Sequence, residues 1–112
     1  MPTNVVILQG DISQLKVDTI VPVDRIGTRE AYREALRAAA ARHSRSIAFP
    51  DGTGLSGDRP AAVRIALAEV RDFLIRHPNA FSEIIFACWD TENYHLYKEM
   101  LGGENRMIDI PT

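Results

Sequence analysis

Residues 46–67 decide the fold and read Ser-Ile-Ala-Phe-Pro-Asp-Gly-Thr-Gly-Leu-Ser-Gly-Asp-Arg-Pro-Ala-Ala-Val-Arg-Ile-Ala-Leu. The run Ser46–Pro50 is largely apolar and has the length of a strand, which Pro50 should end because proline has no N–H to donate. Three glycines then fall within the six residues 52–57. Pro60 suits the first turn of a helix, and apolar residues recur after it at helical spacing until His77-Pro78. The stretch predicts a buried strand, a glycine-rich loop and a helix.

Strands and helices alternate on both sides of this stretch. Period-two and continuous apolar runs predict further strands at Val5–Leu8, Thr19–Val23, Glu83–Trp89 and Met107–Pro111. Helical spacing predicts a helix from the candidate N-cap Thr28 to about His43, and another from Asp90 or Thr91 to Gly102-Gly103. Strands and helices that alternate through short links indicate an α/β fold, with a largely parallel sheet covered on both faces by right-handed crossovers.

Composition excludes several classes of protein. A chain of 112 residues allows one domain, spanning 1–112, and 46% apolar with 25% charged residues is typical of a globular protein. No apolar run approaches the roughly 20 residues of a membrane helix, and no signal peptide is evident, so we expect a cytoplasmic protein. One cysteine and three scattered histidines predict neither a disulfide nor a metal site. A net charge of -2 argues against broad nucleic-acid binding.

The loop Gly52–Gly57 is the strongest candidate for a binding site. Its glycines let backbone amides turn towards an anion, and the following helix adds positive charge at its N-terminus, which favours phosphate. The loop spells G-x-G-x-x-G, but the acidic residue of a dinucleotide fingerprint should follow after about 20 residues, whereas Asp90 lies 33 residues beyond Gly57. A Walker A motif is excluded because Asp58-Arg59 stand where Lys and Ser or Thr are needed. A turn without a ligand remains the alternative.

Two other loops should lie at the same edge of the sheet. In the turn Gly10-Asp11-Ile12, the carboxylate can accept a hydrogen bond from an exocyclic amine such as that of adenine, or it can cap its own backbone. Trp89 follows the buried strand, where its indole can stack on a base or fill the core.

Together these pieces resemble the macro domain family, whose members bind ADP-ribose and related nucleotides. The family pattern of a strand, Gly-Asp-Ile and a strand of Val-Asp-Ala-Ile-Val type matches Val6–Ser13 and Val17–Val21. Its Ser-Ile-Ala-Phe-Pro strand, glycine-rich loop and helix match residues 46–67, and its aromatic-Asp pair before a helix matches Trp89-Asp90. The resemblance implies a three-layer α/β/α macro-like fold, with a reduced, mostly parallel sheet of four to five strands and three main helices.

The resemblance also implies a binding module for ADP-ribose or a related adenine nucleotide, with no cofactor. Asp11 would hold the adenine amino group, Ile12 would contact the base through its backbone, and Trp89 would stack on adenine. The phosphates would be held by the backbone amides of Gly52, Thr53, Gly54, Leu55, Ser56 and Gly57.

The chain departs from the family pattern after its second strand. Pro22-Val23-Asp24-Arg25 replace the family's Asn-Ala-Ala-Asn, so the asparagine that serves the distal ribose and many hydrolytic members is missing. Asp24, Arg25 and His43 are the ionisable candidates near that ribose, and their spacing does not pair them as nucleophile and base. Ile26-Gly27-Thr28 replace a glycine-rich diphosphate loop. We therefore expect binding without catalysis.

Two other functions remain open from the sequence. One is hydrolysis of ADP-ribosylated proteins or O-acyl-ADP-ribose, and the other is a degenerate macro fold that serves as a scaffold or interaction domain. Two family strands are missing between His43 and Ser46, and the exposed sheet edges that result predict a homodimer. Cys88 should fill the core, and His77 and His95 should be surface or capping residues.

Overall fold

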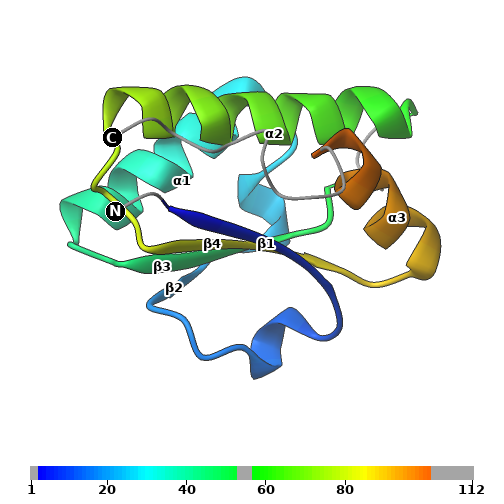
Figure 1. Ribbon diagram of the computed structural model, residues 1–112, viewed down its shortest axis with the longest axis horizontal. Helices are drawn as coiled ribbons and strands as arrows, with labels where there is room; N and C mark the ends of the chain where they lie inside the picture. Colours follow the sequence, from blue (N-terminus) through cyan, green and yellow to red (C-terminus); the bar gives the residue numbers. More distant parts are fainter. Residues whose placement is uncertain (1–2, 53–56, 102–112) are drawn as a thin grey trace.

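The computed structural model describes residues 3–52 and 57–101, which form a four-stranded parallel sheet with three α-helices. The strands lie in the order β1-β4-β3-β2 (Figure 1). Their bounds are Asn4–Gln9 for β1, Thr19–Ile20 for β2, Ser46–Pro50 for β3 and Glu83–Cys88 for β4. The helices are Arg29–Ala41 (α1), Arg59–Arg76 (α2) and Thr91–Met100 (α3), and two short 3-10 helices are Ile12–Gln14 (η1) and Val23–Arg25 (η2). This arrangement confirms the α/β class and the parallel sheet.

Side-chain hydroxyls and carboxylates start the helices. Thr28 Oγ1 accepts a hydrogen bond from the N–H of Ala31 at 3.1 Å, so Thr28 is the N-cap of α1 as predicted. Asp58 caps α2 by accepting from the N–H of Ala61, and Asp90 caps α3 by accepting from the N–H of Asn93 at 2.8 Å. Each cap satisfies one of the N–H groups that a first helical turn leaves without a partner.

Two predicted strands are shorter in the structure. β2 ends at Ile20 and not at Val23, because Pro22 has no N–H for the ladder and η2 begins directly after it. β4 ends at Cys88, which leaves Trp89 outside the strand. The predicted tail strand at 107–111 and the Gly102-Gly103 stop lie outside the described residues. α1 runs into β3 through only a short turn, so no strand stands between them.

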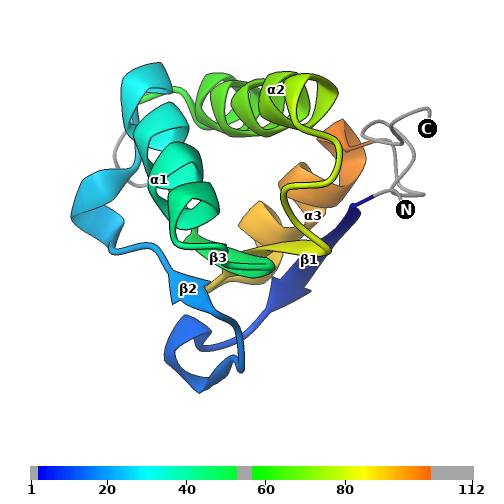
Figure 2. The same ribbon diagram turned by 90° about the vertical axis from the view of Figure 1, so that its left-hand side faces the viewer.

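The described helices cover one face of the sheet, which differs from the expected three layers (Figure 2). The chain moves from β2 to β3 to β4 in a single direction across the sheet, and right-handed crossovers made in one direction place their helices on one face. The step from β1 to β2 runs in the opposite direction, so a right-handed connection there crosses the other face. The connection from β1 to β2 carries η1 past the other face, where η1 contacts β3.

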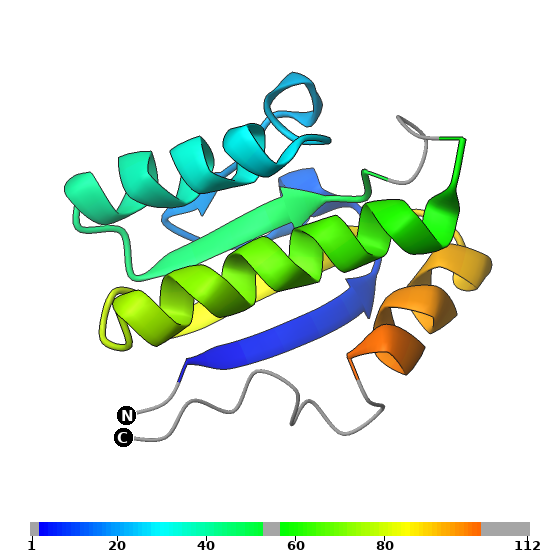
Figure 3. The same ribbon diagram turned by 90° about the horizontal axis from the view of Figure 1, so that it is seen from above.

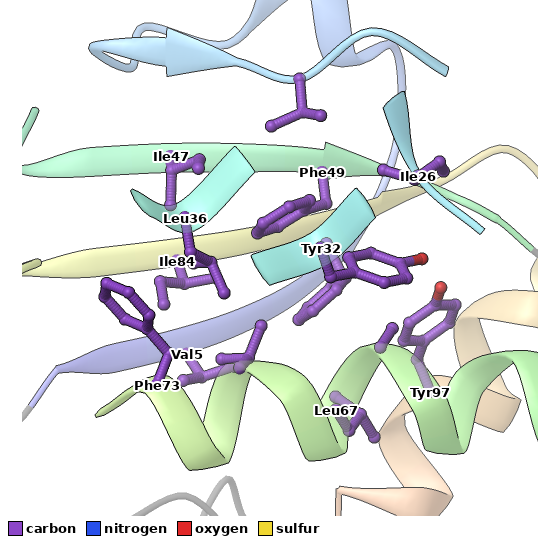
Figure 4. Close-up of a cluster of buried hydrophobic side chains, with 14 of the residues drawn as sticks. Val5, Ile26, Tyr32, Leu36, Ile47, Phe49, Leu67, Phe73, Ile84 and Tyr97 are labelled. Carbon is purple, nitrogen blue, oxygen red and sulfur yellow. The ribbon is translucent and has the colours of Figure 1, made fainter. Parts of the chain in front are cut away.

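The core lies between the sheet and the helices (Figure 4). Phe49 of β3 stacks on Phe86 of β4 with ring centroids 5.4 Å apart, and these rings contact Tyr32 of α1 and Tyr97 of α3. Alternate residues of β4, such as Ile84 and Phe86, point into this cluster. The continuous apolar run of β4 is thus explained by burial on both faces, as expected for a central strand.

Candidate functional site at the carboxyl edge of the sheet

The three predicted loops meet at one edge of the sheet. Because the strands are parallel, their carboxyl ends lie on the same side, where α3 also begins (Figure 3). The N–H of Gly10 donates to the carbonyl of Cys88 at 3.0 Å, which places Asp11 next to Trp89. On the other side of β4, Pro50 pairs with Ala87, so Gly52 begins its loop next to the same strand end. The site thus runs from β1 across β4 to β3.

Asp11 caps its own turn and keeps one carboxylate oxygen available. Its Oδ1 accepts from the N–H of Ser13 at 2.9 Å and from the hydroxyl of Ser13 at 2.8 Å. These two bonds to Ser13 hold the pKa of the Asp11 carboxyl below its usual value of 3.8, so the exposed group is an anion at neutral pH. The capping alternative is confirmed, and Oδ2 can still accept a hydrogen bond from an amino group. Ile12 begins η1 directly beside it.

Trp89 is a surface residue and not a core residue. Its side chain is 68% exposed, although it directly follows the fully buried Cys88. Side chains alternate along a strand, so Trp89 points away from the core side that Cys88 faces. Asp90 then turns the chain away from the sheet into α3, which adds to the exposure of Trp89. An exposed aromatic ring at a strand end offers a flat apolar face on which a base can stack.

Gly52 lies in close contact with two side chains of the core. A Cβ at this position would lie 2.9 Å from the hydroxyl of Tyr32 and 3.2 Å from Cδ1 of Ile26. The backbone of Gly52 therefore rests on the core before the chain turns towards α2. Gly57 is exposed with open space around its Cα, and Thr53, Gly54, Leu55 and Ser56 lie outside the described residues.

Two buried tyrosines lie beneath this loop, and sequence reasoning placed them only as core positions. The hydroxyls of Tyr32 and Tyr97 point to the same end of the core (Figure 4). Burial raises the pKa of Tyr32 to about 12, and burial raises the pKa of Tyr97 further. Asn93 Oδ1 is buried without a hydrogen-bond partner among the described residues, whereas the Tyr97 hydroxyl lies near the backbone of Gly52. The sequence signal that could have found these hydroxyls is the presence of tyrosine, and not phenylalanine, at helix positions that face the core.

The ionisable candidates for the distal ribose are separated by the fold. Asp24 and Arg25 lie exposed in η2, at the carboxyl end of β2, and line a groove of about 490 Å³. His43 lies at the opposite edge, in the turn that leads into the amino end of β3, where it adopts a left-handed φ of 62°. The expectation that His43 lies near a distal ribose is therefore wrong, because α1 runs antiparallel to the strands and carries His43 away from the site.

The remaining nucleophile and histidines have structural surroundings. Cys88 is buried, and burial, followed by the nearby charges of Asp51 and Asp90, raises the pKa of its thiol to about 12. His77 caps the end of α2 and packs on Phe73 with ring centroids 4.7 Å apart, whereas His95 is exposed on α3. These placements confirm the predicted core and surface roles. Within residues 3–52 and 57–101, no three His, Cys, Asp or Glu side chains are grouped to hold a metal ion. No helix in that part of the chain could span a membrane.

Known proteins resemble this chain in sequence and in structure, although no protein-family model matches it. The chain is 39% identical over 103 residues to the O-acetyl-ADP-ribose deacetylase of Cronobacter sakazakii, which covers 83% of this chain and 57% of that protein. It is 38% identical over 107 residues to the protein of that name from Escherichia coli K12, with 87% and 60% covered. The chain therefore spans under two thirds of the length of these relatives.

A solved structure with the same fold is the Trypanosoma brucei macrodomain in complex with ADP-ribose. Its TM-score is 0.63 at 35% identity, and the match covers 74% of this chain and 36% of that one. The macro domain of ganglioside induced differentiation associated protein 2 matches with a TM-score of 0.60 at 27% identity, over 65% of this chain and 37% of that one. Because sequence identity above 30% extends over more than four fifths of the chain and solved macrodomains share its fold, the chain belongs to the macro domain family.

Proposed function

We propose that this chain binds ADP-ribose, or a related adenine nucleotide, along the carboxyl edge of its sheet. Trp89 stacks on the adenine, and Asp11 Oδ2 accepts a hydrogen bond from its amino group. The diphosphate lies over the loop from Gly52 to Gly57, and the distal ribose points towards η2. The observation that carries the proposal is the exposed Trp89 next to the anionic Asp11, with a glycine-rich loop on the other side of the same strand end.

The charges and dipoles at this edge suit the two ends of the ligand. Asp11 is exposed and ionised, which favours the amino group of a base and disfavours a phosphate near β1. The N-terminus of the 18-residue α2 follows the loop after β3, and its dipole favours the negative diphosphate there. Base and diphosphate are therefore expected on opposite sides of β4. The Trypanosoma brucei macrodomain of known structure in complex with ADP-ribose supports the choice of ligand.

Trp89 emission gives the direct test, because it is the one tryptophan in the chain. Titration with ADP-ribose should quench or shift the emission in a saturable way, whereas ribose 5-phosphate should do little because it lacks the base. Asp11→Ala should weaken binding measured by calorimetry by about 1–3 kcal/mol, the cost of losing a hydrogen bond to a charged group. The matched control is Asp72→Ala, which removes an exposed carboxylate from the distal half of α2.

Binding is rejected if the emission stays constant and calorimetry detects no heat at millimolar ADP-ribose. That outcome would favour the scaffold alternative. If Asp11→Ala weakens ADP-ribose binding less than Asp72→Ala does, ADP-ribose remains the proposed ligand, but Asp11 is not part of the base site.

A second candidate function is hydrolysis of O-acetyl-ADP-ribose. The names of the Cronobacter sakazakii and Escherichia coli relatives favour it, and Asp24 lies exposed where β2 ends. Against it, no described side chain pairs with Asp24 or Arg25, and groups that position water are worth orders of magnitude in rate. Release of acetate from O-acetyl-ADP-ribose that is lost in Asp24→Ala would decide for this function.

A further inference from the structure

The outer edge of β2 presents unpaired backbone groups. β2 is the last strand of the sheet, and the N–H of Val21 just beyond it donates to the carbonyl of Ala48 in β3 at 2.9 Å. Since backbone groups of successive residues in a strand point to opposite sides, the N–H and the carbonyl of Ile20 point away from the sheet. Pro22, which would point the same way two residues later, has no N–H. The edge can therefore form one full hydrogen-bonded pair, centred on Ile20.

A groove of about 490 Å³ lies along this edge, lined by residues of β2, η2 and α1. Ile20 is 40% exposed, and Val23 of η2 is 55% exposed. These are two of the four large exposed hydrophobic side chains in the described part of the chain. The apolar members of the lining are Ile20, Val21, Pro22, Ala31, Ala35 and Ala38.

The charges of the groove are divided between its two ends. α1 runs back along β2, so Glu30 and Glu34 of its first half lie towards the carboxyl end of β2, where Asp24 lies as well. Arg42 follows the last residue of α1 and donates to Oγ1 of Thr19 at 3.3 Å, which places it at the beginning of β2. One end of the groove is therefore mainly acidic, although Arg25 also lies there, and the other end carries Arg42.

We propose that this face binds a second copy of the chain about a two-fold axis through Ile20. In an antiparallel pair, two residues directly opposite exchange both N–H···O bonds, so Ile20 is complementary to Ile20 of a second copy. The antiparallel arrangement also brings Arg42 of each copy to the acidic end of the other groove. Pro22 disfavours a longer added strand from a different protein, whereas a two-fold contact needs only the one pair.

Sedimentation over a range of protein concentrations tests the dimer, and charge reversal tests the arrangement. The unchanged protein should show a dimer whose dissociation constant rises about tenfold or more in Arg42→Glu, because that side chain then faces Glu30 and Glu34. Combining Glu34→Arg with Arg42→Glu should restore the dimer, because each reversed charge again meets its opposite. Arg71→Glu, an exposed reversal on α2 away from the groove, should change nothing.

A monomer at high micromolar concentration would overturn the proposal, as would a dimer that Arg42→Glu leaves intact. A dimer that Arg42→Glu weakens but the double reversal does not restore would overturn the two-fold arrangement. Circular dichroism on every variant checks the fold, which reversals of exposed charges should preserve. Asp11, Gly52 and Trp89, which are proposed to hold the base and the diphosphate, do not line the groove, so ADP-ribose binding and dimer formation can be measured separately.

Discussion

Several buried residues near the carboxyl edge carry polar or ionisable side chains. Cys88, Tyr32 and Tyr97 are all buried at one end of the core, and this burial, with a smaller contribution from the charge of Asp51, raises the pKa of each. A Cβ at Gly52 would lie 2.9 Å from the Tyr32 hydroxyl, so a larger residue there would require that side chain to shift. These groups stay neutral at physiological pH and add no negative charge beneath Gly52, while the α2 dipole favours an anion beyond it, as the proposed phosphate site needs.

The raised pKa values predict a loss of stability at high pH. The pKa of Cys88 is about 12 in the folded state against 9.0 ordinarily, so above pH 9 the unfolded chain loses its thiol proton first. The free energy of unfolding should therefore fall between pH 9 and 12, and Tyr32 adds to the fall from about pH 10. Urea denaturation of Cys88→Ala should show a shallower fall than the unchanged protein. Parallel curves for the two proteins would contradict the role given to Cys88.

At the scale of elements, short polar side chains and proline set where helices and strands end. Thr28, Asp58 and Asp90 begin the three helices, while Pro22 ends β2 after two residues. Glu69 of α2 forms an ion pair with Arg33 of α1 at 2.6 Å, which ties the two helices together above the sheet. Residues at the ends of the elements therefore set their bounds, and one ion pair adds to the apolar packing between α1 and α2.

Loss of the α1 cap should cost measurable stability. Thr28→Ala removes the oxygen that accepts from the N–H of Ala31, so we expect a loss of about 0.5–2 kcal/mol in urea denaturation. Thr28→Ser is the matched control, since serine keeps the acceptor and should retain most of the stability. Equal midpoints for the alanine and serine variants would show that the cap contributes nothing to the folded state.

In the described part of the molecule, the α-helices cover one face of the sheet, and the proposed nucleotide-binding edge differs from the edge along β2. The helices and the core cover one face, the segment with η1 passes the other, and β2 stands at the free end of the sheet. Nucleotide binding is proposed at the carboxyl ends of β1, β4 and β3, whereas the proposed dimer contact runs along β2. The base and the diphosphate would therefore lie away from the dimer contact, and only the distal ribose would approach η2.

Ligand binding should stabilise the whole fold. A ligand that binds only the folded state at 100 times its dissociation constant adds about 2.7 kcal/mol, which raises the melting temperature of a chain this size by several degrees. ADP-ribose should produce this shift, and Trp89→Ala should reduce it at equal ligand concentration. Protein concentration is held constant, because a dimer also makes the melting temperature depend on it. An identical shift in Trp89→Ala would exclude the indole from the site.

Local sequence determined the elements of this protein and the class of its fold. The boundaries of β3 and the caps Thr28 and Asp90 follow from proline chemistry and from hydroxyl or carboxylate groups next to apolar runs. The glycine-rich loop and the Gly-Asp-Ile turn were recognisable for the same reason, since a turn depends on residues close in sequence.

Tertiary structure alone decided how these pieces face one another. The connecting helices α1 and α2 share one face because the chain steps from β2 to β3 to β4 in a single direction, and the strand order depends on pairing between residues far apart in the chain. The same long-range pairing exposed Trp89 beside Asp11 and carried His43 to the opposite edge. It also made β2 the last strand of the described sheet, so the outward backbone groups of Ile20 have no neighbouring strand. The residue types of β2 do not specify which of its two sides pairs with another strand.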